Sequence, residues 1–262
     1  MVDGRLGNGN LKMDLQLKGK IALVTGSTKG IGRAIAHSLY NEGCNVIINS
    51  RHSDDLDDIL KDRNRVSSFV ADVTDRNSCK DLVDYVIKKW GRLDILVCNV
   101  GNGSSVPPGE ETVSEWERMF DVNFFSVTNI VETSKNELAK TSGTIVCISS
   151  IAGMEILGAP ITYSVAKSAL NFYVKGISKP LAKYGIRINA IAPGNILFNG
   201  SIWEKKFAEK PQDVQKMLDN DVALKRFGKP EEIANFVTFL ASPVSAFVTG
   251  SLVVVDGGQL RS

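Results

Sequence analysis

The chain has 262 residues, and its 31 Lys and Arg side chains against 29 Asp and Glu side chains leave a formal net charge of +2. A charge this small argues against the basic footprint that nucleic acid phosphates require, so we expect no nucleic acid partner. Apolar residues make up 43% of the chain and charged residues 23%, which is typical of a folded globular protein. No stretch reaches the roughly 18 to 20 apolar residues of a membrane span, so we expect no membrane partner either.

Cysteine usage and targeting signals indicate the compartment. The four cysteines are far apart and form no C-x-x-C pair: Cys44, Cys79, Cys98 and Cys147. This pattern is typical of buried, reduced thiols in a cytoplasmic protein. Only two histidines are present, so we expect no metal site. Residues 1–13 lack the apolar region of a secretory signal, and we interpret them as a flexible leader before a single domain at 14–262.

After the leader, short apolar runs alternate with helix-length amphipathic segments. We expect strands at 21–25, 46–48, 66–70, 93–98, 143–149, 186–191 and 252–255. We expect helices at 30–42, 54–61, 75–89, 112–140 (in two pieces), 162–183 and 230–240, with a long connection at 195–229. This alternation predicts an α/β fold with one doubly wound, Rossmann-like parallel sheet and helices on both faces. Ligands should bind at the carboxyl ends of its strands.

Pro180 lies inside the helix expected at 162–183. Proline lacks an N–H donor and clashes with the carbonyl four residues earlier. We therefore predict a kink between Gly176 and Pro180, which would affect any subunit contact that this helix makes.

The first expected strand runs into a glycine-rich turn that precedes a helix. The turn has the spacing G-x3-G-x-G, at Gly26, Gly30 and Gly32. Glycine lets the backbone approach a pyrophosphate, and the free N–H groups of the next helical turn point toward it. The turn by itself is also compatible with an ordinary strand-to-helix connection.

Further motifs follow the turn in chain order. They are Asn123 in Asp121-Val-Asn-Phe, the S-x12-Y-x3-K series Ser150, Tyr163 and Lys167, the segment Asn189-Ala-Ile-Ala-Pro-Gly194, and Thr249-Gly250 with Val255-Asp-Gly-Gly258. Together with the turn, this series over residues 18–258 resembles the short-chain dehydrogenase/reductase family. The resemblance implies an oxidoreductase that interconverts a ketone and a secondary alcohol by hydride transfer with a nicotinamide cofactor.

Tyr163 and Lys167 are four residues apart on one expected helix, so they share a face. A free tyrosine has a pKa of about 10, and we expect the nearby ammonium to lower that pKa. Tyr163 would then act as the general acid/base, and a packed ring beside a lysine stem is the structural alternative. The resemblance implies that Ser150 binds the substrate carbonyl and that Lys167 also holds the nicotinamide ribose. It also implies that Asn123 holds a water in a proton relay.

The resemblance also implies a set of residues around the cofactor. These are Gly26, Thr28, Lys29, Gly30, Ile31, Gly32, Ser50, Arg51, Asp72, Val73, Asn99, Gly101, Tyr163, Lys167, Pro193, Gly194 and Ile196. NAD-dependent relatives place an Asp where Ser50 stands, whereas here Arg51 and Lys29 supply cations for a 2′-phosphate. We therefore expect NADP(H) rather than NAD(H), with two ordinary surface cations as the alternative.

Two residues depart from the family pattern, one in the NNAG motif and one after Pro193-Gly194. Val100 replaces the Ala of the NNAG motif, and its extra bulk would lie beside the cofactor. Phe198 stands where the family often has a Thr near the carboxamide, so that hydroxyl contact is absent.

The substrate is less well defined than the reaction. The connection at 195–229 is expected to form a substrate lid, and its polar side chains suit hydroxyl-rich or anionic substrates. The closest resemblance is to the 3-oxoacyl-carrier-protein reductase branch, but Asn129 and Tyr184 stand where those enzymes have arginines. A sugar or nucleotide-sugar oxidoreductase is the alternative enzyme, and a non-catalytic cofactor-sensing regulator is the alternative class. The family resemblance implies a homotetramer.

Overall fold

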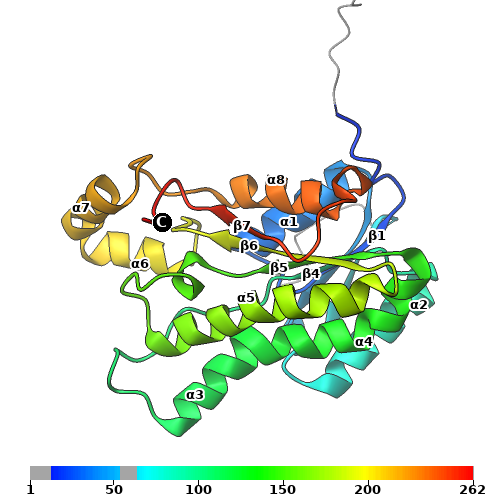
Figure 1. Ribbon diagram of the computed structural model, residues 1–262, viewed down its shortest axis with the longest axis horizontal. Coiled ribbons are helices and arrows are strands. Elements are labelled where there is room, and N and C mark those ends of the chain that lie inside the picture. The colour runs from blue at the N-terminus through cyan, green and yellow to red at the C-terminus, as the bar shows by residue number, and fades with distance from the viewer. Residues whose placement is uncertain (1–12, 54–63, 262) are drawn as a thin grey trace, which may run out of the picture.

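The computed structural model describes residues 13–53 and 64–261, in which seven parallel strands form one sheet (Figure 1). The strands are β1 (Ile21–Val24), β2 (Asn45–Ser50), β3 (Val66–Val70), β4 (Ile95–Cys98), β5 (Thr144–Ile148), β6 (Arg187–Pro193) and β7 (Leu252–Val255). Their order across the sheet is β3-β2-β1-β4-β5-β6-β7. The expected doubly wound, Rossmann-like α/β fold is confirmed.

Helices cover both faces of the sheet. They are α1 (Gly30–Asn41), α2 (Arg76–Trp90), α3 (Val113–Phe120), α4 (Ser126–Thr141), α5 (Ile161–Ala182), α6 (Ile202–Glu209), α7 (Pro211–Asp221) and α8 (Pro230–Ala241). One apolar core joins α1 and α8 to the sheet and includes Leu39 and Val237. A second core on the opposite face joins α2, α4 and α5, and includes Leu82, Ile130 and Leu170. The central strands β1, β4 and β5 are buried at every position, because helices cover both of their faces.

The sheet has its topological switch point at β1, which pairs with β2 on one side and with β4 on the other. The glycine turn follows β1 directly, so the turn lies at this switch point. In doubly wound sheets this crevice at the carboxyl ends of the strands is where ligands bind. Figure 1 shows α6 and α7 beside the C-terminus, at the same end of the sheet.

Most expected helices and strands occur within a few residues of their predicted bounds. Capping residues at the helix ends explain this agreement. The Asp75 side chain caps α2 by accepting a hydrogen bond from Ser78 N at 2.7 Å. Gly91 ends that helix in the left-handed conformation, with φ of 73°. The short helix predicted at 54–61 lies outside the described residues.

The helical stretch predicted at 112–140 in two pieces is continuous. A five-residue π-helix, Asp121–Phe125, joins α3 to α4 without a break. π-helical turns inside α-helices often occur at functional sites, and this one contains Asn123.

The long connection predicted at 195–229 contains two helices that the sequence analysis did not predict. Ser201 caps α6 by accepting a hydrogen bond from Glu204 N at 3.1 Å, and Pro211 begins α7. Both signals were present in the sequence as S-x-x-E and as a proline at the first helical position. The polar composition obscured them, because α6 and α7 bury few side chains.

Helix α5 continues through Pro180 to Ala182, so the proline does not end the helix. The kink expected between Gly176 and Pro180 stays a prediction.

All four cysteines are buried and unpaired, as expected. Burial raises the pKa of Cys44 and of Cys79 to about 12, which makes both thiols poor nucleophiles. Within 13–53 and 64–261, no helix is long and apolar enough to cross a membrane.

Candidate active site

The glycine turn after β1 depends on three glycines with different roles. Gly26 and Gly30 adopt left-handed backbone conformations, with φ of 59° and 53°. A Cβ atom on Gly32 would lie 2.3 Å from Gly26 O, so this glycine lets α1 pack against the turn. Thr28 and Ile31 are half-buried and Lys29 is exposed. The turn therefore presents backbone at its three glycines and leads into the N-terminus of α1, an arrangement that fits a pyrophosphate.

Two asparagines hold this turn in place. Asn99, after β4, donates from Nδ2 to Thr25 O at 3.0 Å and to Gly26 O at 2.8 Å. On the other flank, the Asn49 backbone N–H donates to Ser27 Oγ at 2.9 Å, and its carbonyl accepts from Ser27 N at 3.0 Å. Our sequence analysis missed Asn49. Its signal was a polar residue directly after the apolar run of β2, and it is fully buried.

The residues expected around the adenosine end lie at the ends of β2 and β3. Ser50 is buried and its hydroxyl accepts a hydrogen bond from His52 N at 3.3 Å, while Arg51 is exposed. The Asp72 carboxylate accepts from Thr74 N at 2.9 Å. Asp72 therefore shapes the turn into α2, and the adjacent Val73 is buried.

Ser150, Tyr163 and Lys167 come together after β5 and on the first turns of α5. The Ser150 hydroxyl accepts a hydrogen bond from Ala152 N at 3.1 Å. Lys167 Nζ lies 5.9 Å from the centre of the Tyr163 ring and donates to Ile148 O at 2.9 Å. The i, i+4 spacing on α5 therefore places both side chains beside the end of β5.

Gly101 brings Asn123 and Lys167 together, although they come from different helices. A Cβ atom on Gly101 would lie 3.1 Å from both Asn123 Oδ1 and Lys167 Nζ. Asn123 Oδ1 accepts from Asn102 N, and its Nδ2 donates to Asn102 O, both at 3.0 Å. This pair of bonds fixes the loop after β4 against the π-helix.

Burial shifts the pKa values of both Lys167 and Tyr163. Burial lowers the pKa of Lys167 to about 8, and Lys167 is only 2% exposed. Burial raises the pKa of Tyr163, and only the Ser150 hydroxyl opposes that shift. The lowering of the Tyr163 pKa that we expect from the Lys167 ammonium stays a prediction, and burial acts in the opposite direction.

A hydrogen-bonded cluster that the sequence analysis missed holds the loop after Gly101 against α5. Ser105 Oγ donates to Glu115 Oε1 at 2.5 Å and lies 2.7 Å from Thr162 Oγ1. Arg118 Nε donates to the same carboxylate at 2.8 Å, and this bond and the one from Ser105 lower the pKa of Glu115 to about 2. Thr162 directly precedes Tyr163, so the cluster ties that loop to the helix that carries the ring.

The segment after β6 packs against the end of β7. A Cβ atom on Gly194 would lie 2.8 Å from Asp256 Cα, and the Gly194 N–H donates to Val255 O at 3.0 Å. Pro193 and Ile196 are buried.

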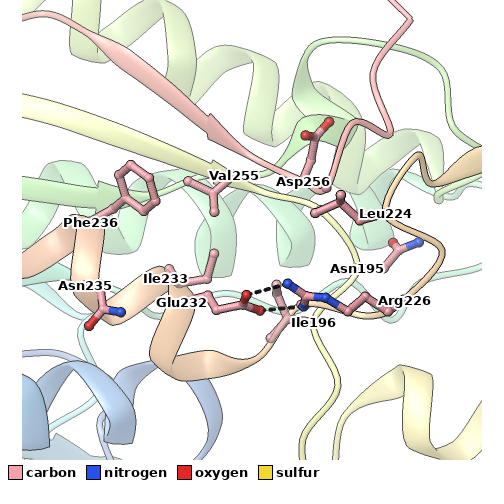
Figure 2. Close-up of a pocket in the computed structure, with 13 residues that line it drawn as sticks. Asn195, Ile196, Leu224, Arg226, Glu232, Ile233, Asn235, Phe236, Val255 and Asp256 are labelled. Atoms are coloured by element: carbon pink, nitrogen blue, oxygen red, sulfur yellow. Dashed lines mark hydrogen bonds and ion pairs between the residues drawn. The ribbon is translucent and has the colours of Figure 1, made fainter.

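Figure 2 shows a cavity of about 250 Å³ on the α8 side of this segment. Asn195 and Ile196 line this cavity beside an ion pair between Arg226 and Glu232. In this ion pair, Arg226 Nη2 lies 2.7 Å from Glu232 Oε1. None of the four residues expected to be catalytic lines this cavity.

Comparisons with known proteins bear on this geometry. A family model described as enoyl-(acyl carrier protein) reductase matches residues 26–259. The chain belongs to the short-chain dehydrogenase/reductase family. It is 34% identical to the 3-oxoacyl-(acyl-carrier-protein) reductase FabG of Thermotoga maritima, over 93% of this chain and 99% of the relative.

Other members of the short-chain dehydrogenase/reductase family are also similar. Glucose 1-dehydrogenase 2 of Bacillus subtilis is 34% identical over 93% of this chain and 95% of the relative. A solved 7α-hydroxysteroid dehydrogenase, complexed with NADH and 7-oxo glycochenodeoxycholic acid, superimposes with a TM-score of 0.87. It is 28% identical, over 95% of this chain and 97% of that one. This protein is accordingly an oxidoreductase of alcohol and carbonyl groups that uses a nicotinamide cofactor.

Proposed function

We propose that this protein is an NADP(H)-dependent reductase of a small ketone, with Tyr163 as the general acid/base. The observation that carries the proposal is the meeting of Ser150, Tyr163, Lys167 and Asn123 at the end of the sheet that holds the glycine turn. The bound cofactor supplies the hydride. Tyr163 gives its proton to the oxygen of the carbonyl as charge develops there, and Ser150 donates a hydrogen bond to that oxygen.

Lys167 and Asn123 support the proton transfer by supplying Tyr163 with a new proton. The buried ammonium of Lys167 is held by Ile148 O, and its position near Asn123 Oδ1 suits a relay that returns a proton to Tyr163. The glycine turn, Asn99, Gly101 and the segment Pro193–Ile196 would hold the cofactor, and the side chains of 195–229 would form the substrate lid. We propose that the described part of 14–262 forms a single domain, and the leader expected at 1–13 lies, apart from residue 13, outside the described residues.

The reaction should depend on pH through Lys167. Its pKa of about 8 means that the ammonium is lost above that pH, while the raised pKa of Tyr163 keeps the phenol protonated. For carbonyl reduction, we expect kcat/KM for the reduced cofactor, which reports the free enzyme, to be constant below pH 8 and to fall above it. Lys167→Arg, whose guanidinium stays charged, should lose this fall. A wild-type profile that is flat to about pH 10 would contradict the assignment.

Cofactor choice is expected to favour the 2′-phosphate. Arg51 and Lys29 are exposed at the adenosine end, and no carboxylate stands at Ser50. We expect NADPH to bind at least about tenfold more tightly than NADH, which corresponds to roughly 1.4 kcal/mol. Arg51→Ala should remove most of this difference, and Arg76→Ala, an exposed arginine on α2, should not. Fluorescence titration of both cofactors measures these dissociation constants, and equal values in the wild type would refute the preference.

Two substrate classes remain in competition. A 3-oxoacyl thioester is favoured by the similarity to the Thermotoga maritima reductase. Asn129 donates to Thr74 O at 2.9 Å instead of presenting a cation, which weakens carrier-protein docking. A sugar or nucleotide-sugar substrate is favoured by the similarity to glucose 1-dehydrogenase 2 and by the polar lid.

The decisive assay follows the absorbance of NADPH with an acetoacetyl thioester and with a panel of keto-sugars. Turnover of one class assigns the substrate. No turnover with either class, together with tight cofactor binding, would favour the non-catalytic regulator.

The proposed assembly is a homotetramer in the cytoplasm. Two separate surfaces expose large apolar side chains, which monomers seldom do. One lies on the π-helix and α5 and includes Phe125 and Phe172, and the other lies on α8 and β7 and includes Phe236, Phe239 and Val254. Two independent self-complementary faces on one chain generate a closed tetramer. Light scattering tests the mass, and a monomer would refute the assembly.

A further inference from the structure

The ring of Phe198 lies directly on the glycine turn. Three of its ring atoms would lie 2.5 to 2.8 Å from a Cβ atom on Gly30, so the ring occupies the place where a side chain of Gly30 would be. Gly30 is the first residue of α1 and has left-handed backbone geometry. On the other flank, a Cβ atom on Gly26 would lie 3.0 Å from Val100 Cγ2. Both residues that depart from the family pattern therefore pack against this one turn.

The position of the Phe198 ring interferes with phosphate binding at the glycine turn. A phosphate bound at the start of α1 must approach the backbone closely, since the first N–H groups of the helix are its partners. An apolar ring in van der Waals contact with Gly30 covers part of that approach. It also offers no hydrogen bond to a phosphate, and it would lower the polarity around a charged group.

Phe198 is also connected to the lid. Its carbonyl accepts a hydrogen bond from Ser201 N at 3.0 Å, and Ser201 is the capping residue of α6. In the first turn of α6, the Trp203 ring lies 5.5 Å from the Phe227 ring. Phe198 and Phe227 line one cavity at the start of α8. A displacement of Phe198 would therefore reach both ends of the lid.

We infer that Phe198 competes with the cofactor for the glycine turn, and that cofactor binding displaces the ring and moves the start of α6. Phe198 is thus a determinant of cofactor affinity that couples the cofactor site to the lid. This inference rests on the proposed NADP(H) binding, and it concerns a side chain that takes no part in the proton transfer.

The first test measures cofactor affinity by titration, independently of turnover. Phe198→Ala removes the competing ring, so we expect the dissociation constant for NADPH to fall at least about fivefold, which is roughly 1 kcal/mol. Phe198→Leu keeps an apolar side chain for packing and should give an intermediate value if the alanine variant folds poorly. Phe247→Ala removes an exposed phenylalanine outside the lid and the glycine turn, and it should leave the constant unchanged.

The second test follows the lid through Trp203. Binding of NADP⁺, which is not fluorescent, should shift the tryptophan emission of the wild type, and Trp203→Phe should abolish the shift. In Phe198→Ala the emission shift should be small, because this variant lacks the ring that connects the glycine turn to the lid.

The outcomes separate this inference from the proposed function. If the wild type binds neither NADPH nor NADH, the proposed function itself fails. If the wild type binds NADPH but Phe198→Ala binds it equally or more weakly, competition by the ring is wrong. An emission shift of equal size in the wild type and in Phe198→Ala would refute the coupling to the lid.

Discussion

Replacing Tyr163 with Phe is expected to lower kcat by about 10² to 10⁴-fold, the usual contribution of general acid–base catalysis. The variant keeps the ring that packs near Lys167 and below Gly103, whose Cβ position is 3.8 Å from that ring. It loses only the hydroxyl that gives its proton to the developing alkoxide. Cofactor affinity should therefore stay within about twofold, since uniform binding is unaffected. Steady-state kinetics and a cofactor titration on one preparation measure both quantities.

The control for this variant is Tyr184→Phe. Tyr184 lies beyond the end of α5, is 51% exposed and packs with Lys135, whose Nζ is 4.3 Å from the ring centre. Loss of its hydroxyl should leave kcat unchanged. If Tyr163→Phe also retained full turnover, the proton would come from another donor and our assignment of the acid would be wrong.

Gly32→Ala is expected to disrupt both the fold and the cofactor site. The added Cβ atom would lie 2.3 Å from Gly26 O and 2.4 Å from Asn99 Nδ2, so the turn or α1 must shift. Forcing a methyl group into a packed site costs about 1 to 3 kcal/mol. We expect a free-energy loss near the upper end of that range, because Asn99 also holds the turn through Thr25 O. Denaturant unfolding measures this loss, and cofactor titration should show at least about tenfold weaker binding, roughly 1.4 kcal/mol.

Gly176→Ala is the matched control, since the same atom is added to another helical glycine. Nothing lies within 4 Å of that Cβ position on α5. Alanine should stabilise the helix there by about 0.5 to 1 kcal/mol. Equal stability of the Gly32→Ala variant and the wild type would show that the turn relaxes freely, and it would remove our account of this glycine.

The sequence alone determined the fold class and the position of the site within it. Short apolar strands, helix caps and glycines act over a few residues, so their spacing could be interpreted without knowledge of distant contacts. This is why the strands around Gly26 and the helix that carries Tyr163 and Lys167 were predicted close to their observed bounds. The helices at 202–209 and 211–221 were missed although their caps are local, because their polar surfaces hide the periodicity.

The tertiary structure decided which side chains meet and how charged they are. Asn123 and Lys167 both come close to Gly101, and the Phe198 ring reaches Gly30 because β1 and β6 end at the same edge of the sheet. No local pattern encodes such contacts between distant segments. The pKa of Tyr163 depends on the tertiary structure in the same way, since burial, which raises that pKa, depends on everything packed around the ring.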